Sequence, residues 1–260
     1  MTRKRDNLRW WLATLAMAAG VCMTVALGLW QMDRAAQKSA WHAAQQAQAS
    51  ASMLDAQAVR SQLAASAEAA EGLQQRRITL RGQWLPAHAV YLDNRQMQGR
   101  PGFYVLMPLQ LEHGDAVLVQ RGWIARNFQE RQTLQAIETP PGTVQVKGVL
   151  SGAPARTYAL TDGDAPDAQN PQIRQNLNLP AFVQATGLAL WPVTVLQTGS
   201  ASEGLLREWP QPSSGIATHH GYAFQWFAIA AVLASMLVWF QWLQPARARR
   251  IHNTNTVSRP

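Results

Sequence analysis

Cysteine is almost absent from this chain of 260 residues, and its scarcity excludes several kinds of site. The single cysteine, Cys22, lies inside a long apolar run near the N-terminus. One thiol cannot form an intramolecular disulfide, and it has no second thiol to join in a copper relay or a zinc ribbon. Sites that need paired thiols are therefore excluded.

The sequence signatures of common enzymes are also missing. The chain has no phosphate-binding glycine loop, no His-Glu-x-x-His helix and no Gly-x-Ser-x-Gly elbow. His42, His88 and His113 fall in different segments, without the spacing of a ligand set. Arg121, inside an apolar run, has both a functional interpretation and a structural one, in which it anchors a turn. We expect the protein not to be an enzyme.

Most of the net positive charge lies at the two ends of the chain. The net charge is +8, of which residues 1–9 contribute +3 and residues 244–260 contribute +4. The region between them is nearly neutral, so a basic surface for nucleic acid is not expected. Each basic tail adjoins an apolar run, and this pattern predicts that both tails are cytoplasmic.

The two apolar runs, residues 10–32 and residues 219–243, are each long enough to cross a membrane. At roughly 1.5 Å per residue, each covers about 30 Å, the thickness of the hydrocarbon core. A cleaved signal peptide has a shorter apolar core, whereas the first run is bracketed by Trp10 and Trp30, which favours a retained anchor. We expect a hairpin of two transmembrane helices in a bacterial inner membrane, with residues 33–218 exported to the periplasm.

Small residues recur along the first run. Gly20, Thr24 and Gly28 are four residues apart and therefore share one helical face. Such a face lets two membrane helices approach closely, although small residues are also common in membrane helices without a packing role.

The exported segment changes character at Gly72. Residues 33–71 are rich in helix formers and predict a helical stalk, in which the first membrane helix continues and a second short helix lies near residues 54–67. Residues 72–218 predict an antiparallel sheet or a small barrel, because short β-rich runs alternate with turn residues. The expected strands are residues 77–82, 89–92, 103–106, 116–124, 143–150 and 191–196. Residues 151–176 predict a long loop and residues 179–186 a short helix. The fold class is thus membrane α + β.

The start of the second apolar run carries an unusual set of side chains. On a helix, His219, Tyr222, Ala223 and Trp226 form one stripe at the outer end of the span. A neutral imidazole in an apolar setting is a natural axial ligand for haem iron, and the small Ala223 leaves room for a flat ring. The other interpretation is an interfacial belt of His, Tyr and Trp. His220 points to another side of the helix.

Four motifs together resemble the Surfeit locus protein 1 family, bacterial type. They are Leu27 to Arg34, similar to the family's Gly-x-Trp-Gln-x-x-Arg signature; Gly99 to Pro108; Val117 to Ile124, similar to Val-Leu-Val-x-Arg-Gly-Trp; and His219 to Phe227, similar to His-x-x-Tyr-Ala-x-Gln-Trp-Phe. Their order, with two flanking membrane helices, covers most of the chain. Residues 35–70 and 151–176 carry no family signal.

The resemblance implies an assembly factor for haem-copper terminal oxidase (cytochrome c oxidase) that helps haem a reach subunit I. It implies that His219 is the ligand of the haem iron, with Tyr222 and Trp226 beside it. Gly28, Trp30, Gln31 and Arg34 match the first motif and are expected at the same outer leaflet, where Arg34 could pair with a haem propionate. The implied partners are subunit I, haem a synthase and membrane lipid.

Two alternatives stay open. One is a haem-free membrane scaffold that holds subunit I during cofactor insertion. The other is an unrelated two-helix envelope protein such as a chain-length regulator or sensor, which the short tails and the lack of a coiled coil disfavour. The sequence leaves open whether the target oxidase uses cytochrome c or quinol.

Overall fold

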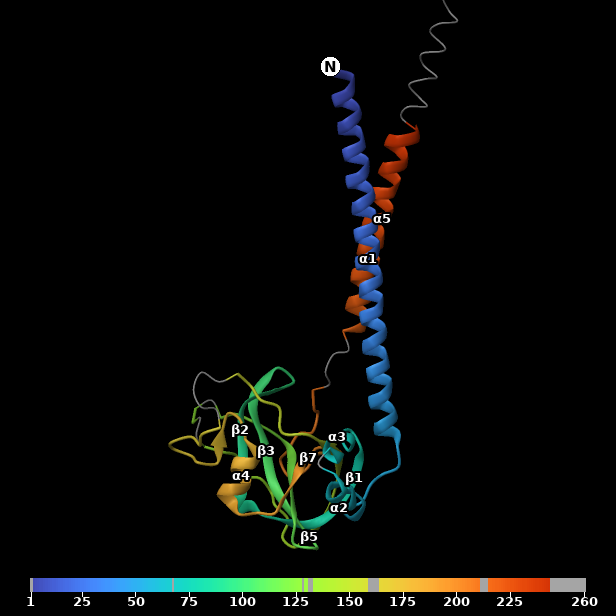
Figure 1. The fold of residues 1–260 in the computed structure, drawn as a ribbon. Helices are drawn as coiled ribbons and strands as arrows, with labels where there is room; N and C mark the ends of the chain where they lie inside the picture. Colours follow the sequence, from blue (N-terminus) through green and yellow to red (C-terminus); the bar gives the residue numbers. More distant parts are fainter. Residues whose placement is uncertain are drawn as a thin grey trace, which may run out of the picture. The chain divides into compact units, whose positions relative to one another are not determined.

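A computed structural model describes residues 2–243 except 67, 128, 131, 132, 159–163 and 211–214; for residues 2–9 and 243 it describes the backbone alone. The predicted tail at residues 244–260 and the side chains of the tail at 1–9 lie outside the described part. The chain forms two compact units, residues 1–43 with 212–260 and residues 44–211. Figure 1 shows the helices and strands of both units.

The first unit consists of two long helices. Helix α1 spans Thr2–Ser50 and helix α5 spans Ile216–Val238, followed by the π-helical turn η2, Trp239–Leu243 (Figure 1). Among the described residues, these are the two helices long and apolar enough to cross a membrane, and only 11% of each apolar window is buried. A soluble core helix would be mostly buried, so the exposed apolar surface fits contact with lipid. The prediction that the first helix continues beyond the apolar run is confirmed.

The small-residue face of α1 packs against α5. A Cβ atom at Gly20 would lie 3.4 Å from Leu233 Cδ1, and one at Gly28 would meet the ring of Phe227. Thr24, between the two glycines, is buried and donates its hydroxyl proton to Gly20 O at 2.8 Å. Gly20, Thr24 and Gly28 therefore form a packing face, as their spacing predicted.

The second unit is a closed five-stranded barrel with a short extension. Its strands are β1 (Arg77–Trp84), β2 (Val90–Met97), β3 (Arg100–Leu111), β4 (Ala116–Ala125), β5 (Thr143–Ser151), β6 (Ile173–Arg174) and β7 (Leu190–Gln197). The barrel runs β1-β5-β7-β4-β3 and closes where Gly82 pairs with Leu111; β2 and β6 extend the sheet beyond β3. All pairs around the barrel are antiparallel except β4 with β7. This strand order is that of the five-stranded Greek-key barrel of OB-folds.

Each predicted strand is present, and the small barrel is the correct alternative. Strand β1 alternates exposed and buried residues, with Ile78, Leu80 and Trp84 inside. Strand β4 is buried along almost its whole length, because one of its faces lines the barrel and Leu118, on the other, packs with Phe182. Helix α4, Leu179–Thr186, coincides with the predicted helix, and the predicted loop at 151–176 contains the short strand β6.

The predicted second short helix is present, but its assignment to a stalk is wrong. After α1 ends, helix α2 (Ala56–Ala65) begins at Asp55, whose side chain accepts a hydrogen bond from Ala58 N at 2.8 Å, and α3 (Ala69–Gly72) follows. Val59 of α2 is fully buried in the barrel core. A few apolar residues suffice because only one face of this short helix is covered, and α2 is therefore a core element.

An ion pair fastens α2 to the barrel. Arg60 donates to both carboxylate oxygens of Asp115, one of these bonds measuring 2.9 Å, and Trp191 donates its indole N–H to the same carboxylate at 2.6 Å. Burial raises the pKa of Asp115, but the hydrogen bonds from Arg60 and Trp191 outweigh it and hold the pKa below its ordinary value. The folded protein therefore stabilises the charged form of the Asp115 carboxylate relative to the protonated form.

We expect Asp115→Asn to lower the free energy of unfolding by about 1.5–3 kcal/mol at pH 7, since it weakens hydrogen bonds to a charged group. A depressed pKa stabilises the fold above the unfolded value of about 4, and this stabilisation is lost as the pH falls further. Urea unfolding followed by tryptophan fluorescence should show the gap between variant and wild type shrinking below pH 4. Glu112→Gln, an exposed neutralisation three residues away, is the control; an equal effect of both would contradict the assignment.

Candidate functional site

The middle of α1 and the first turn of α5 bring His219 and Gln31 together within the first unit. Helix α5 begins after Gly215, which has the left-handed φ of 61°, and His219 therefore lies in the first turn. Its Nδ1 atom is 2.7 Å from Gln31 Oε1, in a partly buried hydrogen bond that joins residues 188 positions apart. Two residues from separate predicted motifs thus meet in one contact.

Close packing next to this contact involves Gly28 and Phe227. A Cβ atom at position 28 would lie 2.6–2.9 Å from three atoms of the Phe227 ring, so a side chain there would force the ring or the helices to move. Gly28 is one helical turn from Gln31, and Phe227 is two turns from His219. The absence of a side chain at Gly28 therefore sets how closely the two helices approach beside the His219–Gln31 bond.

The rest of the predicted stripe on α5 is partly exposed. Tyr222 is 49% exposed and Trp226 is partly buried, so both rings are available to lipid or to a flat ligand. Ala223, by contrast, is only 2% exposed. The expectation that Ala223 leaves room for a ring is wrong here, because the small residue is covered in the packed helix pair. His220 is exposed, on a different side from His219.

Trp30 and Arg34 of α1 are both exposed and contact each other. Trp30 is 52% exposed, and the Arg34 guanidinium lies 5.8 Å from the centre of its ring. Arg34 also donates to Gln37 Oε1 at 3.0 Å. The structure thus brings Gln31, Gly28 and His219 together but places Trp30 and Arg34 in a separate, exposed cluster.

Lys38 is a residue that the sequence interpretation missed. Its amine lies beside the start of α5, 3.0 Å from where a Cβ atom of Gly215 would be. Lys38 follows Gln31 by seven residues, which places it on the same helical face two turns further out. That spacing was the available signal, and it adds a cation to this end of the helix pair.

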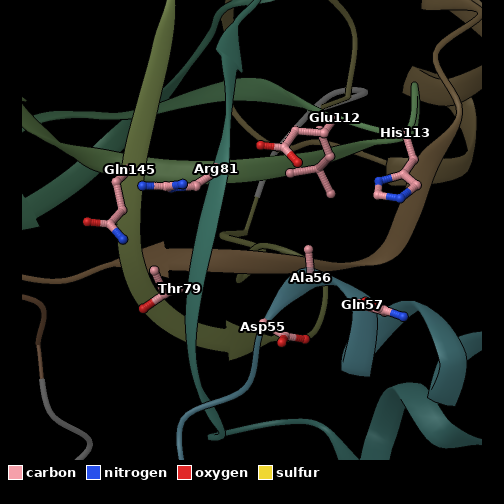
Figure 2. A pocket seen from close by; sticks show the side chains of 9 residues that line it. Asp55, Ala56, Gln57, Thr79, Arg81, Glu112, His113 and Gln145 are labelled. Carbon is pink, nitrogen blue, oxygen red and sulfur yellow. The ribbon is translucent and has the colours of Figure 1, made fainter.

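The second unit has a groove of about 290 Å³, most of whose lining residues are polar or charged (Figure 2). Its walls come from the start of α2, from β1 and β5 and from the turn after β3, with Arg81, Gln145, Glu112 and His113 among the lining residues. Across the described part of the chain, no three His, Cys, Asp or Glu side chains gather as a metal would require. The groove is therefore a surface feature of mixed charge, whereas the helix ends hold the residues that the motifs predicted.

Comparisons with known proteins bear on both units. The model of the SURF1 family matches residues 18–231, which include the barrel and the larger part of both membrane-type helices. A SURF1-like protein of Rickettsia conorii is 26% identical over 221 residues, 82% of this chain and 85% of the relative. A SURF1-like protein of Rickettsia bellii is 24% identical over 80% of this chain and 82% of its own length. A SURF1-like protein of Dictyostelium discoideum is 42% identical over 50 residues, which cover 19% of this chain and 18% of the relative. The chain belongs to the SURF1 family, as its four motifs predicted.

Proposed function

We propose that this protein is an assembly factor for haem-copper oxidase that binds haem a at the outer ends of α1 and α5 and aids its insertion into subunit I. The SURF1 family is linked to oxidase assembly, and its members are assembly factors. The observation that supports a haem site is the contact of His219 with Gln31, at the end of two apolar helices. Haem a is the cargo here, so the protein has to hold it and release it.

The residues at the helix ends fit a haem. The hydrogen bond of His219 uses Nδ1, and among the described residues no hydrogen bond uses Nε2, the nitrogen that would face iron. Tyr222 and Trp226 are exposed enough to pack on a porphyrin. Arg34 and Lys38 supply cations on the outer turns of α1, where carboxylate side groups of haem a would be held by charge.

The same proposal includes a topology. Both basic tails adjoin the inner ends of apolar runs, so α1 and α5 form a hairpin across the bacterial inner membrane with both termini cytoplasmic. The barrel of the second unit is then periplasmic, and His219 and Trp30 lie at the outer leaflet. Haem a would enter this site from the membrane, from the enzyme that makes it (haem a synthase), and leave to subunit I.

The test is an absorption spectrum of the full-length protein purified in detergent from cells that make haem a. We expect bound haem a in the wild type and less than about a tenth of that amount in His219→Ala, because even residues that only support a metal ligand change affinity 10- to 100-fold. His220→Ala, an adjacent exposed imidazole, should keep the pigment. A colourless wild type, or equal occupancy in His219→Ala, contradicts the ligand role.

The close packing of the helices favours a second candidate, a haem-free scaffold for subunit I. Ala223 is covered and Gly28 is in contact with Phe227, so the helix pair is well packed without any cofactor. A scaffold would co-purify with subunit I, carry no pigment, and tolerate His219→Ala without loss of oxidase assembly.

A further inference from the structure

The hydrogen bond between His219 and Gln31 has a fixed direction. The partner atom on Gln31 is the amide oxygen Oε1, which only accepts hydrogen bonds. His219 must therefore donate from Nδ1, and a neutral imidazole that carries its proton on Nδ1 has its lone pair on Nε2. The bond is partly buried, where competing water is scarce and the hydrogen bond is correspondingly stronger.

We infer that Gln31 is a positioning residue that fixes the tautomer and the ring orientation of His219. A free imidazole prefers the proton on Nε2, which would block that nitrogen as a ligand. The amide oxygen of Gln31 reverses the preference and keeps the Nε2 lone pair available. Metal-binding histidines commonly donate their other N–H to an oxygen in this way. The role of this tautomer in haem binding rests on the proposed function, but the tautomer itself exists before any haem binds.

Neighbouring residues explain why Gln31 rather than another amide has this role. Gln37 accepts from Arg34 at 3.0 Å and donates to Asp33 at 2.7 Å, so its amide is engaged on the exposed side of α1. Gln31 shares the helical face of Gly28, whose close packing with Phe227 holds α5 near. The amide that reaches His219 is thus determined by the glycine one turn before it.

The experiment is ¹⁵N NMR of the full-length, haem-free protein in detergent, with labelled histidine, at pH 8. His219 is assigned by its loss in His219→Ala. We expect the wild type to carry the proton on Nδ1 and Gln31→Met, which keeps the length but removes the acceptor, to shift most of the population to Nε2–H. Gln31→Glu, which still accepts, should restore the Nδ1–H form, and the matched control Gln37→Met should resemble the wild type.

Two results would overturn the inference. One is a wild-type His219 that carries its proton on Nε2, which would happen if the Gln31 amide were reversed. The other is a Gln31→Met variant with the same tautomer as the wild type. Titration of each haem-free protein with haem a separates this result from the proposed function. We expect a 10- to 100-fold weaker affinity in Gln31→Met. If the tautomer shifts while the affinity does not, Gln31 positions the ring but His219 is not the haem ligand, and the proposed function fails.

Discussion

Arg121→Met is expected to lower the free energy of unfolding of the barrel unit by about 3–5 kcal/mol, which is the usual cost of removing one partner of a buried ion pair. A domain has only about 5–15 kcal/mol of stability, so this loss is a large fraction of the total. At about 2–4 °C per kcal/mol for a domain of this size, the melting temperature should fall by roughly 6–20 °C.

The expectation follows from how completely Arg121 is enclosed. Its side chain has no exposed surface, and its guanidinium lies 4.5 Å from the ring centre of Trp84. It donates to Glu203 Oε2 at 2.7 Å, to Glu138 O at 2.9 Å and to Thr139 Oγ1 at 3.0 Å. One side chain thus ties β4 both to the segment between β4 and β5 and to the turn at Glu203, 82 residues away in sequence.

Glu203 shows that this contact matters to the fold. It sits in a tight turn with a left-handed φ of 59°, a conformation that costs a residue with a side chain about 1–2 kcal/mol. The ion pair with Arg121 offsets that cost and fixes the turn, after which Leu206 pairs with Trp123 of β4. The structural interpretation of Arg121, as an anchor for a turn, is therefore confirmed.

Thermal unfolding of the detergent-purified protein, followed by near-UV circular dichroism, measures the effect. Arg156→Met is the matched control, because Arg156 pairs with Asp164 while 58% of its side chain is exposed, and exposed pairs contribute only about 0–1 kcal/mol. Equal melting temperatures of Arg121→Met and Arg156→Met would contradict the buried-anchor account. Below its melting temperature, Arg121→Met should still bind haem a as the wild type does.

The strands and α4 could be predicted because local pattern determines them. Alternation such as that of Ile78, Thr79 and Leu80 requires one covered face, and turn residues mark where each strand ends. Closure of the barrel depends on long-range register instead. At Gly82, a Cβ atom would lie 2.2 Å from Gln110 O, so the missing side chain is what allows β1 to pair with β3. The residues around position 82 do not indicate which strand pairs with β1.

At the helix ends, the sequence identified His219 and Gln31 separately, as members of two motifs. Helical spacing relates residues within one helix but does not relate α1 to α5, so neither their hydrogen bond nor the nearby Lys38 could be derived. The buried Ala223 was misinterpreted for a similar reason. A small residue beside a candidate ligand suits either a flat cofactor or a neighbouring helix, and only the three-dimensional structure distinguishes the two.

Gly28→Leu is expected to separate α1 from α5 and to abolish most haem a binding, while the barrel stays folded. Even a single Cβ atom at position 28 would lie 2.6 Å from the Phe227 ring. Overpacking costs about 1–3 kcal/mol, which corresponds to a roughly 5- to 150-fold change in an equilibrium constant. Because Gln31 and His219 meet one turn further along α1, their hydrogen bond should be lost with the close approach of the helices.

Two measurements on the same variants test this. The first is the haem a content of the purified protein. The second is cross-linking of cysteines placed at Gly20 and Leu233, which are neighbours across the helix pair, in a Cys22→Ser background. Gly28→Leu should reduce both the haem a content and the cross-linking.

Gly221→Leu is the matched control, since a Cβ atom at that position would meet no atom within 4 Å. Phe227→Ala combined with Gly28→Leu should restore part of both signals, because it removes the ring that the new side chain strikes. If Gly28→Leu retains haem a and cross-links like the wild type, close packing at Gly28 does not hold the site together. If Gly221→Leu loses as much haem a and cross-linking as Gly28→Leu, the cause is added bulk rather than the contact with Phe227.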